Sequence, residues 1–238
     1  MQQDNMPQDN VPPDDMPPDD MTQDDMTQDD MTPGRMPENN RPRNDRVLTL
    51  PPQVPRTTRG GFTRWVALTI LRLGGWRMVG AFPDLPKAVL LGAPHSSNWD
   101  GIWAFAVKIA MGLDVRIVGK HQLFWWPLGP ILRRIGVIEV NRDAAHGLVG
   151  QLSQRFASQE RFWLGLAPEG TRKRVERWKP GFWKIAKAAD VPVVPAYFHY
   201  PDKIIGIGEP FALTDDMDAD IARIRAWYAP WQGKNRGV

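Results

Sequence analysis

Cysteine is absent from this chain of 238 residues. The absence excludes disulfide bonds, thiolate metal ligands and a cysteine nucleophile. Histidine is scarce, so the imidazoles available for chemistry are those of His95, His121, His146 and His199. Hydrophobic residues nevertheless make up 42% of the sequence, which is enough for a folded core.

Long uncharged hydrophobic runs are also missing. A membrane-spanning helix needs about 20 predominantly apolar residues, whereas the apolar stretch over 61–80 is interrupted by Arg64, Arg72 and Arg77. Its apolar residues follow helical spacing, which predicts an amphipathic surface helix over 61–80. Two interpretations stay open: the helix packs on the domain, or it lies in a bilayer interface with its arginines at the headgroups.

The N-terminal region lacks the basic and apolar segments of a secretory signal. It consists largely of pentapeptides such as MPQDN and MTQDD, which are rich in proline, glutamine and aspartate. This composition buries too little apolar surface to offset the entropy of ordering the backbone. We predict a disordered acidic tail over 1–45, a linker over 46–60 and a folded domain over 61–238.

Charge is divided unevenly along the chain. Residues 1–40 carry eleven acidic residues and one basic residue, whereas from Arg41 onward 29 lysines and arginines stand against 16 acidic residues. A basic folded part is typical of proteins that meet phosphates, nucleic acid or an anionic membrane. Eleven tryptophans favour a membrane surface, because tryptophan suits an apolar–aqueous boundary. The basic, aromatic-rich segment 171–184 and the sequence LFWWP are expected to contribute to that surface.

Short apolar runs alternate with helical patterns from Lys87 onward. The runs AVLLGAP, DVRIVGK, GVIEV, FWLGLAPE, VPVVPAYF and KIIGIGEPF read as strands, and helical patterns of varying length separate most of them. The alternation predicts an α/β fold with a central, largely parallel sheet flanked by helices. Ligands of such sheets bind beyond the carboxyl ends of the strands. We therefore expect the site in the loops after Pro94, Lys120 and Glu169.

The loop after Pro94 reads HSSNWD. Ser97 and Asp100 have the spacing of a capping box, with Ser97 as the N-cap of a helix and Asp100 as its third residue. His95 would then lie in the loop, where the carboxylate orients the imidazole and raises its basicity. Two interpretations remain open from these residues: His95 and Asp100 form a catalytic pair, or they are a turn residue and a capping residue.

Other catalytic arrangements are missing from the sequence. It contains no G-x-S-x-G nucleophile elbow, and no histidine stands at metal-ligand spacing from a second one. A general base without a protein nucleophile remains, so the substrate itself must supply the attacking hydroxyl group. We expect neither a metal nor a cofactor.

Four segments between residues 88 and 200 resemble the glycerophospholipid acyltransferases in the order that this family shows. HSSNWD matches the H-x4-D motif, and APEGTR resembles the F-P-E-G-T-R block. GKHQLFWWPLGPILRRIGVIEVNRD resembles the block between them, and VPVVPAYF resembles the fourth block, V-P-[IV]-[IV]-P. The chain resembles a bacterial 1-acylglycerol-3-phosphate acyltransferase or a close relative of these enzymes.

The resemblance implies an enzyme of phospholipid biosynthesis, peripheral on the cytoplasmic face of the membrane. It would transfer a fatty acyl group from acyl-CoA or acyl carrier protein, as co-substrate, to the free hydroxyl of 1-acylglycerol-3-phosphate, giving phosphatidic acid. His95 would be the general base and Asp100 its orienting partner. The headgroup site implied by the family blocks consists of Lys120, Arg142, Glu169, Gly170, Thr171 and Arg172.

Two positions depart from the family pattern. Gln122 stands where a glutamate is common, and Ala167 stands where a phenylalanine is usual. Another acceptor, such as lyso-ornithine lipid, is therefore a second hypothesis. A third is a non-catalytic lipid-binding protein that has the same fold.

Overall fold

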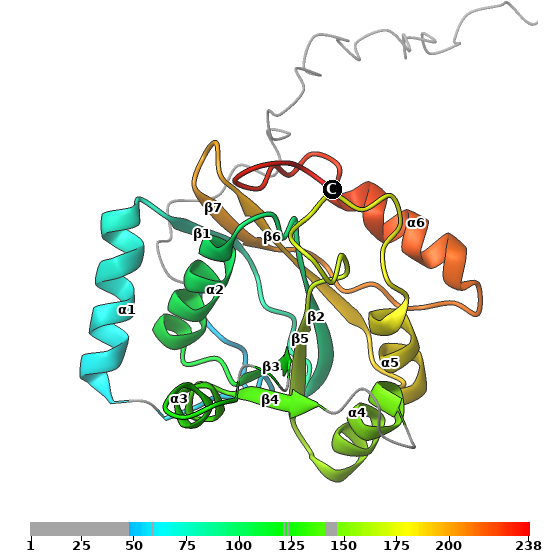
Figure 1. Cartoon of the computed structure of the whole chain (residues 1–238), viewed down its shortest axis with the longest axis horizontal. Helices are drawn as coiled ribbons and strands as arrows, with labels where there is room; N and C mark the ends of the chain where they lie inside the picture. Colours follow the sequence, from blue (N-terminus) through cyan, green and yellow to red (C-terminus); the bar gives the residue numbers. More distant parts are fainter. Residues whose placement is uncertain (1–47, 59, 121, 123, 141–146) are drawn as a thin grey trace, which may run out of the picture. The chain divides into compact units, whose positions relative to one another are not determined.

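The computed structural model of the protein describes residues 48–58, 60–120, 122, 124–140 and 147–238, and these form a seven-stranded sheet in the order β1-β7-β6-β2-β5-β3-β4 (Figure 1). The strands are β1 Arg77–Gly80, β2 Lys87–Ala93, β3 Val115–Lys120, β4 Val137–Val140, β5 Phe162–Leu166, β6 Val193–His199 and β7 Ile204–Ile207. From β6 to β4 every pairing is parallel, whereas β7 runs antiparallel to β6 and pairs in parallel with β1. The predicted α/β fold with a largely parallel sheet is confirmed.

Helices cover both faces of this sheet. They are α1 Gly61–Gly74, α2 Asn98–Met111, α3 Leu128–Arg134, α4 Gly147–Ser158, α5 Gly181–Ala189 and α6 Met217–Tyr228. In Figure 1, α1, α2 and α3 lie together on the left, and α4, α5 and α6 lie on the right. Because both faces are covered, the central strands are continuous apolar runs rather than alternating ones.

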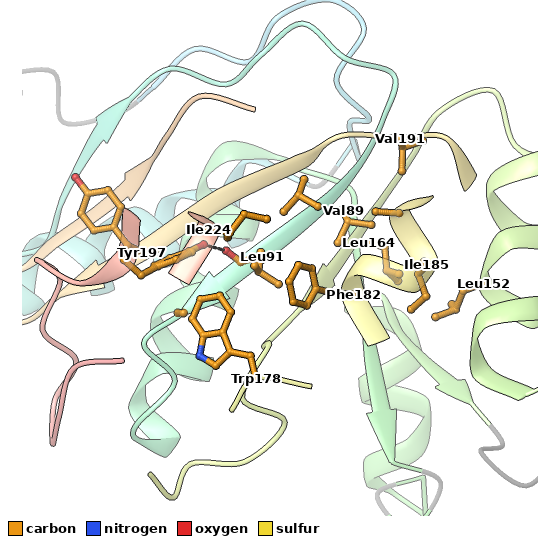
Figure 2. Close-up of a cluster of buried hydrophobic side chains, with 14 of the residues drawn as sticks. Val89, Leu91, Leu152, Leu164, Trp178, Phe182, Ile185, Val191, Tyr197 and Ile224 are labelled. Atoms are coloured by element: carbon orange, nitrogen blue, oxygen red, sulfur yellow. Dashed lines mark hydrogen bonds between the residues drawn. The ribbon is translucent and has the colours of Figure 1, made fainter. Parts of the chain in front are cut away.

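The first hydrophobic core lies between the sheet and α4, α5 and α6 (Figure 2). Val89 and Leu91 of β2 point into it, since residues two apart share one face of a strand. The helices contribute Leu152, Ile185 and Ile224, all of them fully buried. Burial of each such side chain stabilises the fold by about 1.5–3 kcal/mol.

The aromatic residues of the segment 171–184 were predicted to lie on a membrane surface, but they pack inside the domain. Trp178 and Phe182 belong to the first core, and the Trp183 indole donates a hydrogen bond to buried Asp220 at 2.9 Å. The basic residues of the segment are exposed. Only its charges are therefore available to an anionic surface.

The second core lies on the other face of the sheet and includes residues from the predicted linker. Ala88 and Trp163 of the strands pack there with Ala67 and Leu71 of α1 and with Ala106 and Ala110 of α2. Leu50 and Val54 are also buried in this core, and Arg56 forms an antiparallel bridge with Leu113. Residues 48–58 are therefore part of the domain, because their apolar side chains complete its core. The acidic tail predicted over 1–45 lies outside the described residues.

The helix predicted over 61–80 is shorter than expected. It ends at Gly74, and Gly75 adopts a left-handed conformation with φ 74°, which is a common way to end a helix. Residues 77–80 then form β1, whose central Met78 and Val79 are buried. The spacing of the apolar residues does not reveal this change from helix to strand, because two adjacent buried residues are compatible with both.

A side chain of α6 joins two central strands. The fully buried Tyr228 hydroxyl donates a hydrogen bond to the Leu91 carbonyl of β2 and accepts one from the Ala196 N–H of β6 at 3.1 Å. Pro195, the neighbour of Ala196, has no N–H that could donate a hydrogen bond to an adjacent strand of the sheet. The hydroxyl thus links the strands beside a position where the backbone lacks a donor.

Replacing Tyr228 by phenylalanine should lower the free energy of unfolding by about 1–3 kcal/mol, because it leaves the two backbone groups unsatisfied in the core. Denaturant unfolding monitored by tryptophan fluorescence measures this change. The matched control is Tyr197→Phe, which removes a hydroxyl from β6 but keeps the ring stacked on Trp231. Equal stabilities of Tyr228→Phe and the wild type would contradict this role of the hydroxyl.

Candidate active site

The loop between β2 and α2 contains the first predicted site residues. Ser97 is the N-cap of α2, and the capping box with Asp100 forms as predicted: the Ser97 hydroxyl accepts from the Trp99 N–H, and Asp100 accepts from the Ser97 N–H. The box satisfies backbone donors that the first turn of a helix otherwise leaves free. His95 therefore lies in the loop and Asp100 in the first turn.

Both oxygens of the buried Asp100 carboxylate are used. Oδ2 accepts from the N–H groups of Ser96 and Ser97, at 2.7 and 2.8 Å, and Oδ1 accepts from the Tyr200 hydroxyl at 2.6 Å. Burial by itself raises the pKa of this carboxyl, but the hydrogen bonds from His95, Tyr200 and the two amides hold the pKa below its ordinary value of 3.8. Asp100 is therefore ionised at neutral pH.

His95 lies beside this carboxylate. Its Nδ1 is 3.3 Å from Asp100 Oδ2, and 30% of its side chain is exposed. A proton on Nδ1, directed at the carboxylate, leaves the lone pair of Nε2 free to accept a proton. The structure brings the predicted pair together, with capping and orientation performed by the same aspartate.

Glu169, which follows β5, contacts the same loop from the neighbouring strand. Its Oε1 accepts the His95 backbone N–H at 3.0 Å, and its Oε2 accepts from Arg236 at 2.7 Å. The side chain is fully buried, and this burial raises the pKa of the carboxyl despite both partners. Glu169 was predicted as a headgroup contact, but in this structure it faces the protein interior with both oxygens occupied.

The rest of the EGTR segment turns outward. Gly170 has φ 63°, a conformation that residues with a Cβ rarely adopt, and its N–H closes a turn on the Ala167 carbonyl at 3.1 Å. Thr171 is half-buried, and its hydroxyl accepts the Lys173 N–H at 3.3 Å. The exposed Arg172 guanidinium donates to the Asn98 side chain at the start of α2. Arg172 therefore lies beside the His95 loop.

The remaining two predicted headgroup residues belong to β3 and to the segment after β4. Lys120 is the last residue of β3, at the same edge of the sheet as His95 and Glu169. Arg142 lies outside the described residues. We therefore keep the roles of both as predictions.

Two residues at this edge were not predicted. Tyr200 directly follows β6, the strand beside β2, so the rule that ligands bind beyond strand ends identifies its position. Arg236 belongs to the segment 232–238, which has no periodic pattern. No local signal in the sequence connects Arg236 with Glu169, which is 67 residues away.

Comparisons with known proteins show the family and the fold of the chain. The sequence model of the acyltransferase family matches residues 81–199, half of the chain. The chain therefore belongs to the acyltransferase family and is an enzyme of that class. No curated protein matches the chain.

A solved structure has a similar fold. It is the crystal structure of the 1-acyl-sn-glycerophosphate (LPA) acyltransferase PlsC from Thermotoga maritima, with a TM-score of 0.50 and 13% sequence identity. The similarity covers 68% of this chain and 75% of that chain. At this identity the match supports the fold, and the chemistry must be argued from the residues.

His199 supports the segment that contains Arg236. It is buried at the end of β6, where its Nδ1 accepts the Gln232 N–H at 3.1 Å, and the next residue, Tyr200, donates its own N–H to the Gln232 carbonyl at 2.9 Å. Burial lowers the pKa of His199, although Asp202 opposes the effect. Protonation of Nδ1 would remove the acceptor for the Gln232 N–H.

Stability should consequently fall below about pH 6.5, the ordinary pKa of histidine, because the unfolded chain then binds a proton that folded His199 resists. Above this pH the contribution is fully present. One proton changes the free energy of unfolding by at most about 1.4 kcal/mol per pH unit. Urea unfolding of the wild type and of His199→Gln between pH 5 and 8 measures the difference. Parallel stability curves would rule out this linkage.

Proposed function

We propose that the protein transfers a fatty acyl group from an acyl thioester, acyl-CoA or acyl carrier protein, to the free hydroxyl of a lysophospholipid. The first candidate acceptor is 1-acylglycerol-3-phosphate, which becomes phosphatidic acid. One observation supports this most strongly: the His95 imidazole lies against an ionised, buried carboxylate at the ligand-binding edge of a parallel sheet. Similarity to a structure described as an LPA acyltransferase favours this acceptor class.

The reaction begins with proton abstraction. His95 Nε2 takes the proton of the acceptor hydroxyl as its oxygen attacks the thioester carbonyl, and a tetrahedral intermediate forms. The C–S bond then breaks, and the imidazolium returns the proton to the leaving thiolate. Asp100 stabilises the imidazolium and holds its orientation without taking the proton, because the pKa of Asp100 is low.

The acceptor phosphate requires cations close to the base. Arg172 is exposed beside the His95 loop, and its planar fork suits phosphate oxygens. We assign it to the headgroup site, with Lys120 and Arg142 added by the family resemblance. Thr171 and the exposed Gly170 backbone complete the turn that presents Arg172. Glu169 is better described as a support of the His95 loop, since it is fully buried.

His95→Ala should reduce acyl transfer by about 10²–10⁴-fold, because the general base is lost. The assay uses 1-acylglycerol-3-phosphate, lyso-ornithine lipid and a zwitterionic lysophospholipid, each with acyl-CoA and with acyl carrier protein. Thermal unfolding and vesicle binding serve as controls and should remain unchanged.

Each result of this assay has a distinct meaning. Near wild-type turnover by His95→Ala would remove His95 from the mechanism. Wild-type transfer to lyso-ornithine lipid alone would select the second acceptor hypothesis. Vesicle binding without transfer to any acceptor would favour the non-catalytic lipid-binding protein.

We further propose that the enzyme binds the membrane surface through its exposed apolar residues. The large exposed hydrophobic side chains of the described residues are Phe62, Trp65, Ile70 and Leu73 of α1, Trp99 and Ile102 of α2, and Trp125, Trp126 and Ile131 at α3. These helices lie on one side of the sheet in Figure 1. Within the described chain, no helix is long and apolar enough to cross a bilayer.

The position of α2 connects this apolar surface with the site. Its first turn contains Asp100, and the exposed Trp99 lies beside it, with its ring stacked on Trp103 at 6.1 Å. A lysolipid held in the outer part of a bilayer would therefore meet apolar contacts next to the base. This arrangement supports a peripheral enzyme, and we propose the cytoplasmic face because the acyl donors are cytoplasmic.

Trp126→Ala should weaken binding to vesicles of phosphatidylglycerol and phosphatidylcholine roughly tenfold or more. Trp126 is 82% exposed, and burying a large apolar side chain contributes about 1.5–3 kcal/mol. Vesicle flotation measures the partition. Lys187→Ala on α5 is the control and should stay within about twofold of the wild type. Equal losses in both variants would argue against the apolar surface as the binding face.

A further inference from the structure

A single guanidinium nitrogen joins three groups at the catalytic edge. Arg236 Nη2 donates to Glu169 Oε2 at 2.7 Å and to the Lys173 carbonyl at 2.8 Å, and it lies 3.5 Å from the His95 carbonyl. Nη1 of the same side chain donates to the Gly237 carbonyl at 2.9 Å. The side chain is 18% exposed, and its terminal nitrogens are directed at protein groups.

The partner of Arg236 is a carboxylate that needs a cation. Glu169 is fully buried, and its other oxygen accepts the His95 backbone N–H at 3.0 Å. A buried carboxylate without a partner is strongly destabilising. If Arg236 were lost, the Glu169 side chain would move toward water or bind a proton. Movement of Glu169 would release the His95 N–H from its acceptor.

The residues just before Arg236 contact the same loop. The Asn235 side-chain amide donates to the Ser96 carbonyl at 2.7 Å, and the Asn235 backbone N–H donates to the Ser96 hydroxyl at 3.2 Å. The Lys234 ammonium lies 5.0 Å from the centre of the Trp99 ring. Three consecutive side chains therefore contact the loop that holds the base and the first turn of α2.

We propose that Arg236 is a positioning residue for acyl transfer, which sets the place of the His95 base through Glu169 and the backbone on both sides of the imidazole. The inference rests on the proposed function and extends it to a residue outside the segment that the family match covers, 81–199. Arg236 contacts protein groups rather than substrate, because the hydrogen bonds of its two terminal nitrogens go to Glu169 and to backbone carbonyl groups. It therefore differs from Arg172, which we assign to the acceptor phosphate.

The expected kinetic effect follows from geometry. A displacement of about 1 Å in a catalytic group can reduce turnover by around 10²-fold without removing any substrate contact. Loss of Arg236 should therefore lower kcat and change the KM of either substrate little. A headgroup contact would behave differently, because its loss raises the KM of the acceptor.

Three variants test this. Arg236→Met removes the charge at similar length and should lower kcat at least tenfold, with both KM values within about twofold of the wild type. Arg236→Lys keeps a cation with three donors and should recover kcat to within about threefold. Arg223→Met is the matched control, since Arg223 also pairs with a buried carboxylate, that of Asp220 at 2.8 Å, and contacts none of the His95 loop. It should keep kcat within twofold.

A measurement without substrate separates this inference from the proposed function. Amide hydrogen exchange followed by NMR should be at least tenfold faster at His95 in Arg236→Met than in the wild type, and unchanged in Arg223→Met. The double variant Glu169→Gln with Arg236→Met removes the unpaired charge and should exchange more slowly at His95 than Arg236→Met alone.

The outcomes are distinct for the two proposals. Exchange at His95 that Arg236→Met leaves unchanged would overturn the positioning role, and so would a kcat within twofold of the wild type in a protein that transfers acyl groups. If the wild type transfers no acyl group to any lysolipid, the proposed function fails. The exchange rates still decide whether Arg236 holds the loop.

Discussion

The carboxylate of Asp100 connects the elements that form the candidate active site. One oxygen accepts the Ser96 and Ser97 amides and lies against the His95 imidazole, and the other accepts the Tyr200 hydroxyl. The start of α2, the orientation of the base and the end of β6 are therefore fixed by one ionised group. None of the three can shift without disturbing the hydrogen bonds of the others. In the proposed mechanism, the capping box therefore also orients the general base.

The order of the strands explains why the site forms at this place. Strands β6, β2 and β5 are neighbours and parallel, so Tyr200, His95 and Glu169 emerge at one edge although they are far apart in the sequence. Two buried carboxylates approach the same loop but differ in their electrostatics. Asp100 receives enough hydrogen bonds to lower its pKa, whereas burial dominates at Glu169 and raises its pKa. One is suited to stabilise a charged imidazole and the other to hold a backbone.

Local patterns in the sequence predicted the features that depend on neighbouring residues. The spacing of Ser97 and Asp100 predicted the cap, and the alternation of apolar runs predicted the sheet and the edge at which His95 and Glu169 meet. Features decided by distant contacts were missed or misread. The partner of Glu169 comes from the far end of the chain, and Trp178 is buried by α6 rather than by a membrane. The predicted end of α1 was wrong because residues 77–80 pair with β7 and form the strand β1.

The turn at Gly170 separates two residues of the EGTR motif, Glu169 and Arg172, that differ in their surroundings. Glu169 on one side faces the interior and requires a counter-ion from the protein, whereas Arg172 on the other side faces the surface. In relatives of this enzyme, residue identities at 169 and 236 should therefore covary, independently of the residue at 172. An enzyme that retains the buried glutamate without an arginine in this segment must neutralise it in another way, with a cation from another element or with a bound proton.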